Sequence, residues 1–453
     1  MRGLSLTLRT HEPAMQGFFK LFSNKSELPT VPDFDPVIRQ VEEPDRVVIP
    51  LDYPGRIHYL PTVQAGDSVR RGQVIGRSRL GNCAFASISG KVKEITTTWT
   101  THSVHSPAVV IENDGKQGLT PEEMFDGPVT VGDPYSALAR IRSAGVNPPW
   151  RLSGRDYGDG QIEGLPRIKA VIIKGIHEEP TILTAQLLLE QRADTLSEGL
   201  RIGRSLLPDV PIWLTVPEHL HSWAQSRFSE WVEVVAVPTH YTARIERELV
   251  ARLLGQRILN TESFISQGII VQDLEYLLAT VDALQGTSPF LQKCLTISGT
   301  NQDKAITVRF PLGSSVRHIL GSQGLKASDY KRTVVGGPMT GVAQYSDLTP
   351  VTYKSGIFLI AEDLSPFDPV APCIFCGRCT RVCPAGIQVH LVNRMIEFGE
   401  LEAAKDLHPE ACHECGLCAH VCPAQRPIVQ LLHFCNHEVT QAERYNWNEK
   451  AKK

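Results

Sequence analysis

The sequence lacks a surplus of basic charge and a long apolar run, and each absence excludes a class of protein. Among 453 residues, 46 are Lys or Arg and 49 are Asp or Glu, which gives a net charge of −3. This balance does not indicate the basic face that a nucleic-acid partner would require. No run of about eighteen uncharged apolar residues occurs either, so we expect no membrane-spanning helix.

The N-terminus lacks the continuous apolar stretch of a secretory signal, because Arg9, His11, Glu12 and Pro13 interrupt residues 1–21. We therefore expect a cytoplasmic protein. The same segment could form a short amphipathic anchor to a membrane or to another subunit, and a disordered tail is the alternative. In the cytoplasm, where thiols stay reduced, clustered cysteines are expected to hold a metal.

The cysteines are strongly clustered, because nine of the eleven lie after residue 370. Eight of them form two copies of the pattern C-x2-C-x2-C-x3-C-P, which is the run of bacterial two-cluster ferredoxins. The two copies are Cys373-Ile-Phe-Cys376-Gly-Arg-Cys379-Thr-Arg-Val-Cys383-Pro384 and Cys412-His-Glu-Cys415-Gly-Leu-Cys418-Ala-His-Val-Cys422-Pro423.

This spacing predicts two [4Fe–4S] clusters with crossed ligation. Three cysteines of one loop can bind three corners of a cubane, and the fourth leaves on a helix toward the other cluster. A pair of zinc sites is the alternative, but zinc would usually show separate C-x2-C pairs. The predicted ligand sets are Cys373, Cys376, Cys379 and Cys422 for one cluster, and Cys412, Cys415, Cys418 and Cys383 for the other.

The segment between the two runs, residues 387–408, has helical periodicity and is expected to break near Gly399. The ferredoxin part is therefore predicted to be helical rather than a compact β-hairpin form. Cys435 lies outside the pattern, and we interpret it as a core thiol.

The rest of the chain changes its periodicity twice. Residues 46–95 alternate short β-rich runs with turns, which is typical of a lipoyl/biotinyl-type barrel sandwich. Residues 167–285 alternate buried strands with helical stretches over 181–206 and 243–254, which indicates an α/β core with parallel strands. A further small unit contains Gly336-Gly-Pro-Met-Thr-Gly341. That glycine run could cradle a phosphate, but a turn is the simpler interpretation.

This order of domains, together with Gly66-Asp67, Gly72-Gln73, the Gly336–Gly341 run and both cysteine runs, resembles the RnfC family, whose members belong to the Rnf electron-transport complex. The resemblance extends from about Val47 to Glu438. It implies that the small unit is a soluble-ligand-binding β-grasp (SLBB) domain. It also implies that the α/β core is similar to the flavin subunit of respiratory complex I, with bound FMN that oxidises NADH.

The sequence departs from the family at the flavin and nucleotide site. The expected Gly-Leu-Gly-Gly-Ala-Gly-Phe-Pro-Thr loop is replaced by Asn147-Pro-Pro-Trp150, which cannot give the close backbone approach of glycine. The family's Asn-Gly-Ala-Glu-Cys-Glu-Pro appears as Lys174-Gly-Ile-His-Glu-Glu-Pro180, and its Gln-Asn-Val as Gln272-Asp-Leu274. The family's paired Asp and its Lys-Tyr-Pro-Gln-Gly-Gly-Glu are also lost, near Gln186 and His240.

Five lost signatures lead us to expect a core that neither binds FMN nor oxidises NADH. The opposite interpretation remains open, in which Gly154, Gly158 and Gly160 form an altered loop and Glu178 and Glu179 face a nucleotide. His177, Glu178 and Glu179 are interpreted as solvated loop residues rather than as general acids or bases, and no catalytic residue is assigned.

We predict a multidomain α/β plus β fold. Its expected parts are an N-terminal tail (1–40), a barrel sandwich (41–115), a Rossmann-like α/β core (134–288), an SLBB β-grasp domain (289–346), a helical two-cluster ferredoxin domain (362–440) and a tail (441–453).

The predicted function is an iron–sulfur electron-transfer subunit of a multi-subunit, membrane-associated oxidoreductase, peripheral to the cytoplasmic face of the membrane. Two alternatives stay open: an FMN-containing NADH dehydrogenase subunit of an Rnf-type ion-pumping complex, and a redox-sensing adaptor or docking protein. The expected partners are other subunits of a redox complex, including membrane subunits, and a redox partner such as NADH, ferredoxin or a flavoprotein.

Overall fold

The computed structural model describes residues 28–53, 57–102, 104–125, 127–129, 134–146, 167–258, 262–362 and 372–438. The chain divides into two compact units, Thr30–Pro366 and a smaller unit that contains Phe367–Lys453. The predicted N-terminal anchor, the altered loop at 147–160 and the tail at 441–453 lie outside the described residues. Within the described part, no helix has the length and apolar character needed to cross a membrane.

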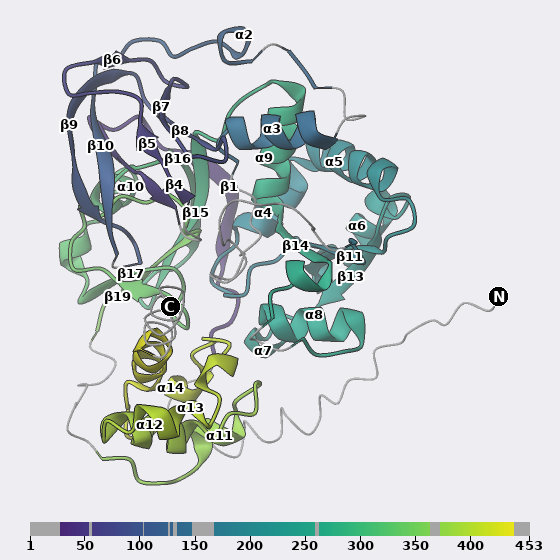
Figure 1. Cartoon of the computed structure of the whole chain (residues 1–453), viewed down its shortest axis with the longest axis vertical. Helices are drawn as coiled ribbons and strands as arrows, with labels where there is room; N and C mark the ends of the chain where they lie inside the picture. Colours follow the sequence, from purple (N-terminus) through teal and green to yellow (C-terminus); the bar gives the residue numbers. More distant parts are fainter. Residues whose placement is uncertain are drawn as a thin grey trace, which may run out of the picture. The chain divides into compact units, whose positions relative to one another are not determined.

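The barrel sandwich consists of two small sheets with the strand orders β2-β10-β9-β6 and β5-β7-β8, and a short β3-β4 ribbon (Figure 1). Val47, Ile75 and Ile111 are buried in its shared core. Gly90 is required where β9 begins, because a Cβ there would lie 1.9 Å from the carbonyl oxygen of Glu112. The strands are β2 Arg46–Pro50, β3 Asp52–Tyr53, β4 Ile57–His58, β5 Leu60–Pro61, β6 Ser68–Val69, β7 Val74–Arg77, β8 Cys83–Phe85, β9 Gly90–Trp99 and β10 His105–Asn113.

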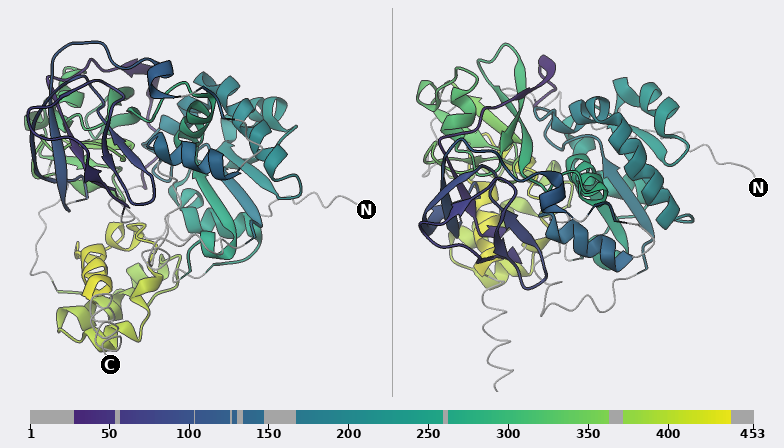
Figure 2. Two further views of the ribbon diagram at one scale, coloured as in Figure 1. Left: turned by 45° about the horizontal axis from the view of Figure 1, so that its top comes forward. Right: turned by 90° about the horizontal axis from the view of Figure 1, so that it is seen from above.

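The α/β core, teal in Figure 2, is built on a parallel sheet of order β13-β12-β11-β14. Strand β11 is apolar on both faces, as expected for a parallel strand covered by helices on each side. Val171 and Ile173 pack with α4, α5, α6 and α9, whereas Ala170 and Ile172 pack with α8. The strand order reverses between β11 and β14, and ligands of such sheets bind beyond the carboxyl ends of the strands at that point.

The helices of this core follow the predicted stretches but are interrupted. The stretch at 181–206 divides at Arg192, and the stretch at 243–254 is preceded by a separate short turn that ends before Ile245. The elements are α2 Pro121–Met124, α3 Pro134–Ser143, β11 Ala170–Lys174, α4 Thr184–Gln191, α5 Ala193–Leu206, β12 Ile212–Pro217, η1 Glu218–Leu220, α6 His221–Phe228, β13 Glu233–Val237, α7 Tyr241–Arg244, α8 Glu246–Leu254, η2 Ile265–Gln267, β14 Ile269–Asp273 and α9 Leu274–Gln285.

The β-grasp domain is a mixed sheet of order β1-β16-β15-β19-β17-β18, with α10 packed on it. Two of its strands lie outside the expected range of 289–346. Residues 34–40, expected in the N-terminal tail, form β1 and pair in parallel with β16, and β19 pairs with both β15 and β17. The elements are β1 Phe34–Gln40, β15 Gln292–Gly299, β16 Ala305–Pro311, α10 Val316–Gly321, η3 Ala327–Asp329, β17 Arg332–Val335, β18 Val342–Ala343 and β19 Gly356–Ile360.

The smaller unit is helical, as predicted. The helical stretch between the cysteine runs breaks at Gly399, which has a φ of +77°. Val392, Ile396 and Leu432 are buried in its apolar core, where Cys435 is also fully buried. The elements are α11 Arg378–Arg381, α12 Val389–Glu397, α13 Leu401–Lys405, η4 Pro409–Ala411, α14 Leu417–His420 and a helical segment over 428–438.

Candidate iron–sulfur centre

The two cysteine loops have the same unusual backbone. In the first loop, Phe375 has a φ of +54° and Gly377 a φ of +67°; in the second, Glu414 and Gly416 have φ values of +54° and +76°. Left-handed residues at two nearby positions curve the chain so that successive N–H groups can point into one concavity, which suits a negatively charged group. A short helix then follows each loop and carries the third cysteine of the run, and the fourth cysteine lies two residues beyond the end of that helix.

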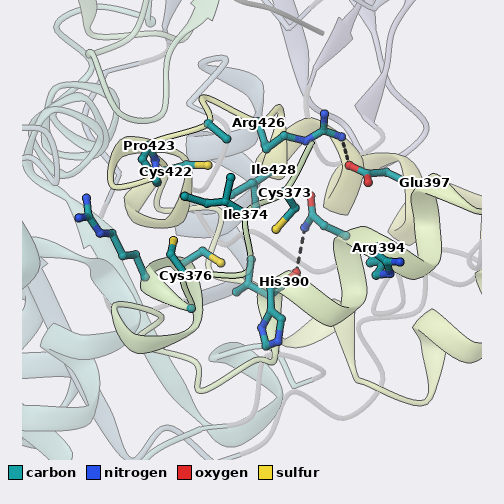
Figure 3. A pocket seen from close by; sticks show the side chains of 16 residues that line it. Cys373, Ile374, Cys376, His390, Arg394, Glu397, Cys422, Pro423, Arg426 and Ile428 are labelled. Carbon is teal, nitrogen blue, oxygen red and sulfur yellow. Dashed lines mark hydrogen bonds and ion pairs between the residues drawn. The ribbon is translucent and has the colours of Figure 1, made fainter. Parts of the chain in front are cut away.

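The first predicted ligand set surrounds one cavity of the smaller unit. Cys373, Cys376 and Cys379 from the first run and Cys422 from the second line this cavity together. Figure 3 shows the sulfur atoms of Cys373, Cys376 and Cys422 directed toward the same space. The crossed arrangement expected from the sequence is therefore geometrically available to these four thiols.

The second predicted set is also brought together, because Cys412 and Cys418 both interact with Cys415 and Cys383. Burial raises the pKa of the Cys412 thiol to about 12, and the neighbouring Glu414, Cys415 and Cys383 raise it further. Burial likewise raises the pKa of Cys418, with Cys412, Cys415 and Cys383 adding to the shift. Only the thiolate binds iron, so iron must supply the charge that stabilises these deprotonated sulfurs.

The donor set fits a cluster better than it fits a single ion. Zinc needs four donors at about 2.0–2.3 Å around one point. Over the described residues, no group of three or more His, Cys, Asp or Glu side chains is spaced to bind one metal ion. Two sets of four thiols, each beside a concave backbone loop, supply the number and kind of donors that two cubanes require.

Polar side chains, three of them from α12, lie at the cavity of the first set and were not predicted from the sequence. The Thr380 hydroxyl lies 2.9 Å from His390 Nδ1, and Arg426 forms an ion pair with Glu397 (Figure 3). The guanidinium of Arg394 lies over the ring of Phe375. His390, Arg394 and Glu397 recur at helical spacing, so one face of the predicted helix could have indicated them.

The α/β core has a second cavity, of about 270 Å³, at the point where the strand order reverses. Its walls include the last residues of β11 and β14, Lys174 and Asp273. The Nζ of Lys174 lies 2.9 Å from Asp273 Oδ1 and 2.5 Å from Glu246 Oε2. Burial disfavours the charged form of Lys174, but the nearby carboxylates of Asp273, Glu246 and Glu178 have the larger effect. The pKa of this lysine is therefore raised.

The described residues of this cavity do not fit the phosphate of FMN. Four carboxylates and three lysines line the cavity. Two of these lysines already form ion pairs, Lys174 with Glu246 and Lys293 with Glu275. Burial lowers the pKa of His177 to about 3, so that this imidazole is neutral. The N–H of Glu179 donates to His177 Nδ1 at 3.2 Å, which fixes the remaining proton on Nε2.

The Gly336–Gly341 loop binds an anion, but the anion is a side chain of the same chain. Glu179 Oε1 accepts hydrogen bonds from the Met339 and Thr340 N–H groups and from the Thr340 hydroxyl, at 3.0, 2.6 and 2.8 Å. Glu179 is fully buried, so its interpretation as a solvated residue was wrong. Gly337 permits this packing, because a Cβ there would lie 2.3 Å from Glu179 Cδ.

Two segments of the chain match known domain families. Residues 34–116 match the RnfC barrel sandwich hybrid domain, and residues 372–426 match the 4Fe-4S dicluster domain. The N-terminal match covers β1 as well as the barrel strands, and the C-terminal match covers all eight cysteines of the two runs.

Similar proteins extend over most of the chain. A subunit of the ion-translocating oxidoreductase complex of Pseudomonas aeruginosa is 28% identical over 83% of this chain and 49% of its own length, so the chain spans about half of that relative. A subunit of the proton-translocating ferredoxin:NAD(+) oxidoreductase complex of Clostridium ljungdahlii is 29% identical over 87% of this chain and 88% of its own length.

A solved NAD+-reducing [NiFe]-hydrogenase in the H2-reduced state aligns with 72% of this chain and 69% of its own, at 14% identity and a TM-score of 0.42. That score is too low to establish a shared fold. The sequence relatives and the two matched domains agree with the order of domains in the structure, and by these likenesses the chain is RnfC-like, with a 4Fe-4S dicluster domain at its C-terminal end.

Proposed function

We propose that this chain is the iron–sulfur electron-transfer subunit of a membrane-associated, multi-subunit oxidoreductase. Single electrons would pass through two [4Fe–4S] clusters. One would be bound by Cys373, Cys376, Cys379 and Cys422, and the other by Cys412, Cys415, Cys418 and Cys383. The observation that carries the proposal is the doubled loop geometry, which brings together four thiols from both runs at the first site.

The α/β core is proposed to contribute structure rather than flavin chemistry. Its cavity contains an ion-pair network at the ends of β11 and β14, and the Gly336–Gly341 loop is occupied by Glu179. Both features leave no excess of cationic side chains for a flavin phosphate among the residues that the structure describes. NADH oxidation would then belong to a partner.

The partners are proposed from the printed names of the relatives. Those proteins are subunits of ion-translocating complexes, two of them named as ferredoxin:NAD(+) oxidoreductases. A chain of this kind would work on the cytoplasmic face of a membrane, beside membrane subunits. An electron relay with two clusters needs a donor and an acceptor, and this requirement also favours a complex.

Counting electrons tests the proposal. Anaerobically purified protein should take up about two electrons per chain on titration with dithionite, one for each cluster. Cys422→Ser and Cys415→Ser should each lower the uptake to about one. Cys435→Ser is the matched control, because this thiol is buried in the same unit but lies outside both ligand sets, and its uptake should stay at about two. Unchanged uptake in Cys422→Ser would refute the ligand assignment.

A further inference from the structure

The two cysteine runs have the same backbone but opposite charge. Residues 372–398, which contain the first run, carry three arginines and one glutamate. Residues 399–425, which contain the second run, carry five carboxylates and one lysine. Because both loops have left-handed residues at the same two positions, the difference between the sites lies mainly in the side chains around them.

Positive charge is fixed beside the first loop. Phe375 lies between the ligands Cys373 and Cys376, and the Arg394 guanidinium carbon is 4.9 Å from its ring centroid. The ring of Phe398 lies on the same guanidinium at 5.0 Å. These two cation–π contacts hold Arg394 at the cavity of the first ligand set, which it lines.

Two more arginines add to this charge. Arg378 lines the same cavity. The Nη1 atom of Arg381 lies 3.3 Å from the position that a Cβ on Gly377 would occupy, and so it lies against the first loop. Arg426 also lines the cavity, but its charge is balanced by Glu397.

Negative charge characterises the second loop. Glu414 occupies the position that Phe375 has in the first loop, between the ligands Cys412 and Cys415, and residues 399–413 carry four more carboxylates. Two contacts act in the opposite direction: the Glu414 N–H donates to Cys412 Sγ at 3.3 Å, and His433 Nε2 lies 3.5 Å from Glu414 Oε2. Neutral donors and a half-exposed imidazole do not offset five carboxylates against one lysine.

We propose that these side chains make the two sites unequal in redox potential, so that the site of Cys373, Cys376, Cys379 and Cys422 is reduced first. One-electron reduction adds one negative charge and changes no bond or proton, so nearby arginines favour it and nearby carboxylates oppose it. An electron that first reduces the second site would then pass to the first site, and the second site would be oxidised again. The inference rests on the proposed function, because it requires both clusters.

A potentiometric titration followed by electron paramagnetic resonance tests this inference on the full-length, anaerobically purified protein. The wild type should show two separate midpoint potentials. Arg394→Gln should lower only the higher one, and Glu414→Gln should raise only the lower one. We expect each change to alter the distribution of the electron between the sites about tenfold, which corresponds to about 59 mV for one electron.

Two control variants separate the explanations. Arg394→Lys keeps the charge and should largely restore the higher potential. Arg317→Gln, in a surface ion pair of the larger unit, should move neither potential. About eight irons per chain with one shared midpoint, or a lowered second potential in Arg394→Gln, would overturn this inference alone. A chain without the clusters would overturn the proposed function, and this inference with it.

Discussion

Replacing Glu179 with alanine is expected to destabilise the larger unit, because this buried carboxylate joins the α/β core to the β-grasp domain. It accepts two backbone N–H groups and one hydroxyl from the Gly336–Gly341 loop. Alanine would leave the N–H groups of Met339 and Thr340 without that acceptor. An unsatisfied buried donor costs about 1–3 kcal/mol, and the Thr340 hydroxyl can rotate to another acceptor.

Two such donors would cost about 2–6 kcal/mol if fully buried, and because Met339 and Thr340 are only half-buried, the expected cost for Glu179→Ala is about 2–4 kcal/mol. Burial raises the pKa of Glu179, so the charged form is held there at some cost, and the true value should lie toward the lower end of that range. Glu179→Gln keeps an acceptor oxygen in the same place and should cost about 1 kcal/mol or less. Comparing the alanine and glutamine variants separates the contribution of the hydrogen bonds to the free energy of unfolding from the contribution of the charge.

Urea unfolding at pH 7, followed by tryptophan fluorescence, measures both variants, since Trp213 and Trp223 lie in the α/β core. Arg317→Ala serves as the control. It removes an exposed ion pair with Asp347, which should change the free energy of unfolding by about 0.5 kcal/mol or less. A loss below about 1 kcal/mol in Glu179→Ala, or an equal loss in both Glu179 variants, would refute the role given to this carboxylate.

Further predictions concern the cavity of the α/β core. Lys174→Ala leaves Asp273 and Glu246 without their shared cation and should cost about 2 kcal/mol by urea unfolding, less than a fully buried pair because Asp273 is half-exposed. His177 has a pKa of about 3 in the folded chain, below the value of about 6.5 in the unfolded one. The unfolded state therefore binds the proton first as pH falls, and stability is full above pH 6.5 and declines toward pH 3. His177→Gln should flatten this decline in melting temperature between about pH 6.5 and 5.

The features that could be predicted from the sequence are those set by local spacing. The cysteine runs define both loops, and their glycines Gly377 and Gly416 take the left-handed conformation. Helices α12 and α13 were predicted from periodicity, and their break at Gly399 follows from the same conformational preference. These elements depend on residues within a few turns of one another.

The elements that were missed depend on distant partners. Strand β1 contains Pro36 and has no clear alternation, and its hydrogen bonds come from β16, more than 250 residues further along the chain. Strand β19 is paired on both sides by β15 and β17. The burial of Glu179 depends likewise on a loop about 160 residues away. No local sequence pattern indicates such contacts, because the sequence around Glu179 is typical of an exposed polar turn.

The central claim is that this chain relays electrons through two clusters without a flavin of its own. Its direct test is the cofactor content of anaerobically purified protein. The visible spectrum is recorded before and after addition of NADH. The account predicts about eight irons and eight sulfides per chain, no FMN, and no bleaching by NADH. One FMN per chain with rapid bleaching by NADH would contradict it, and would make the chain a divergent NADH dehydrogenase.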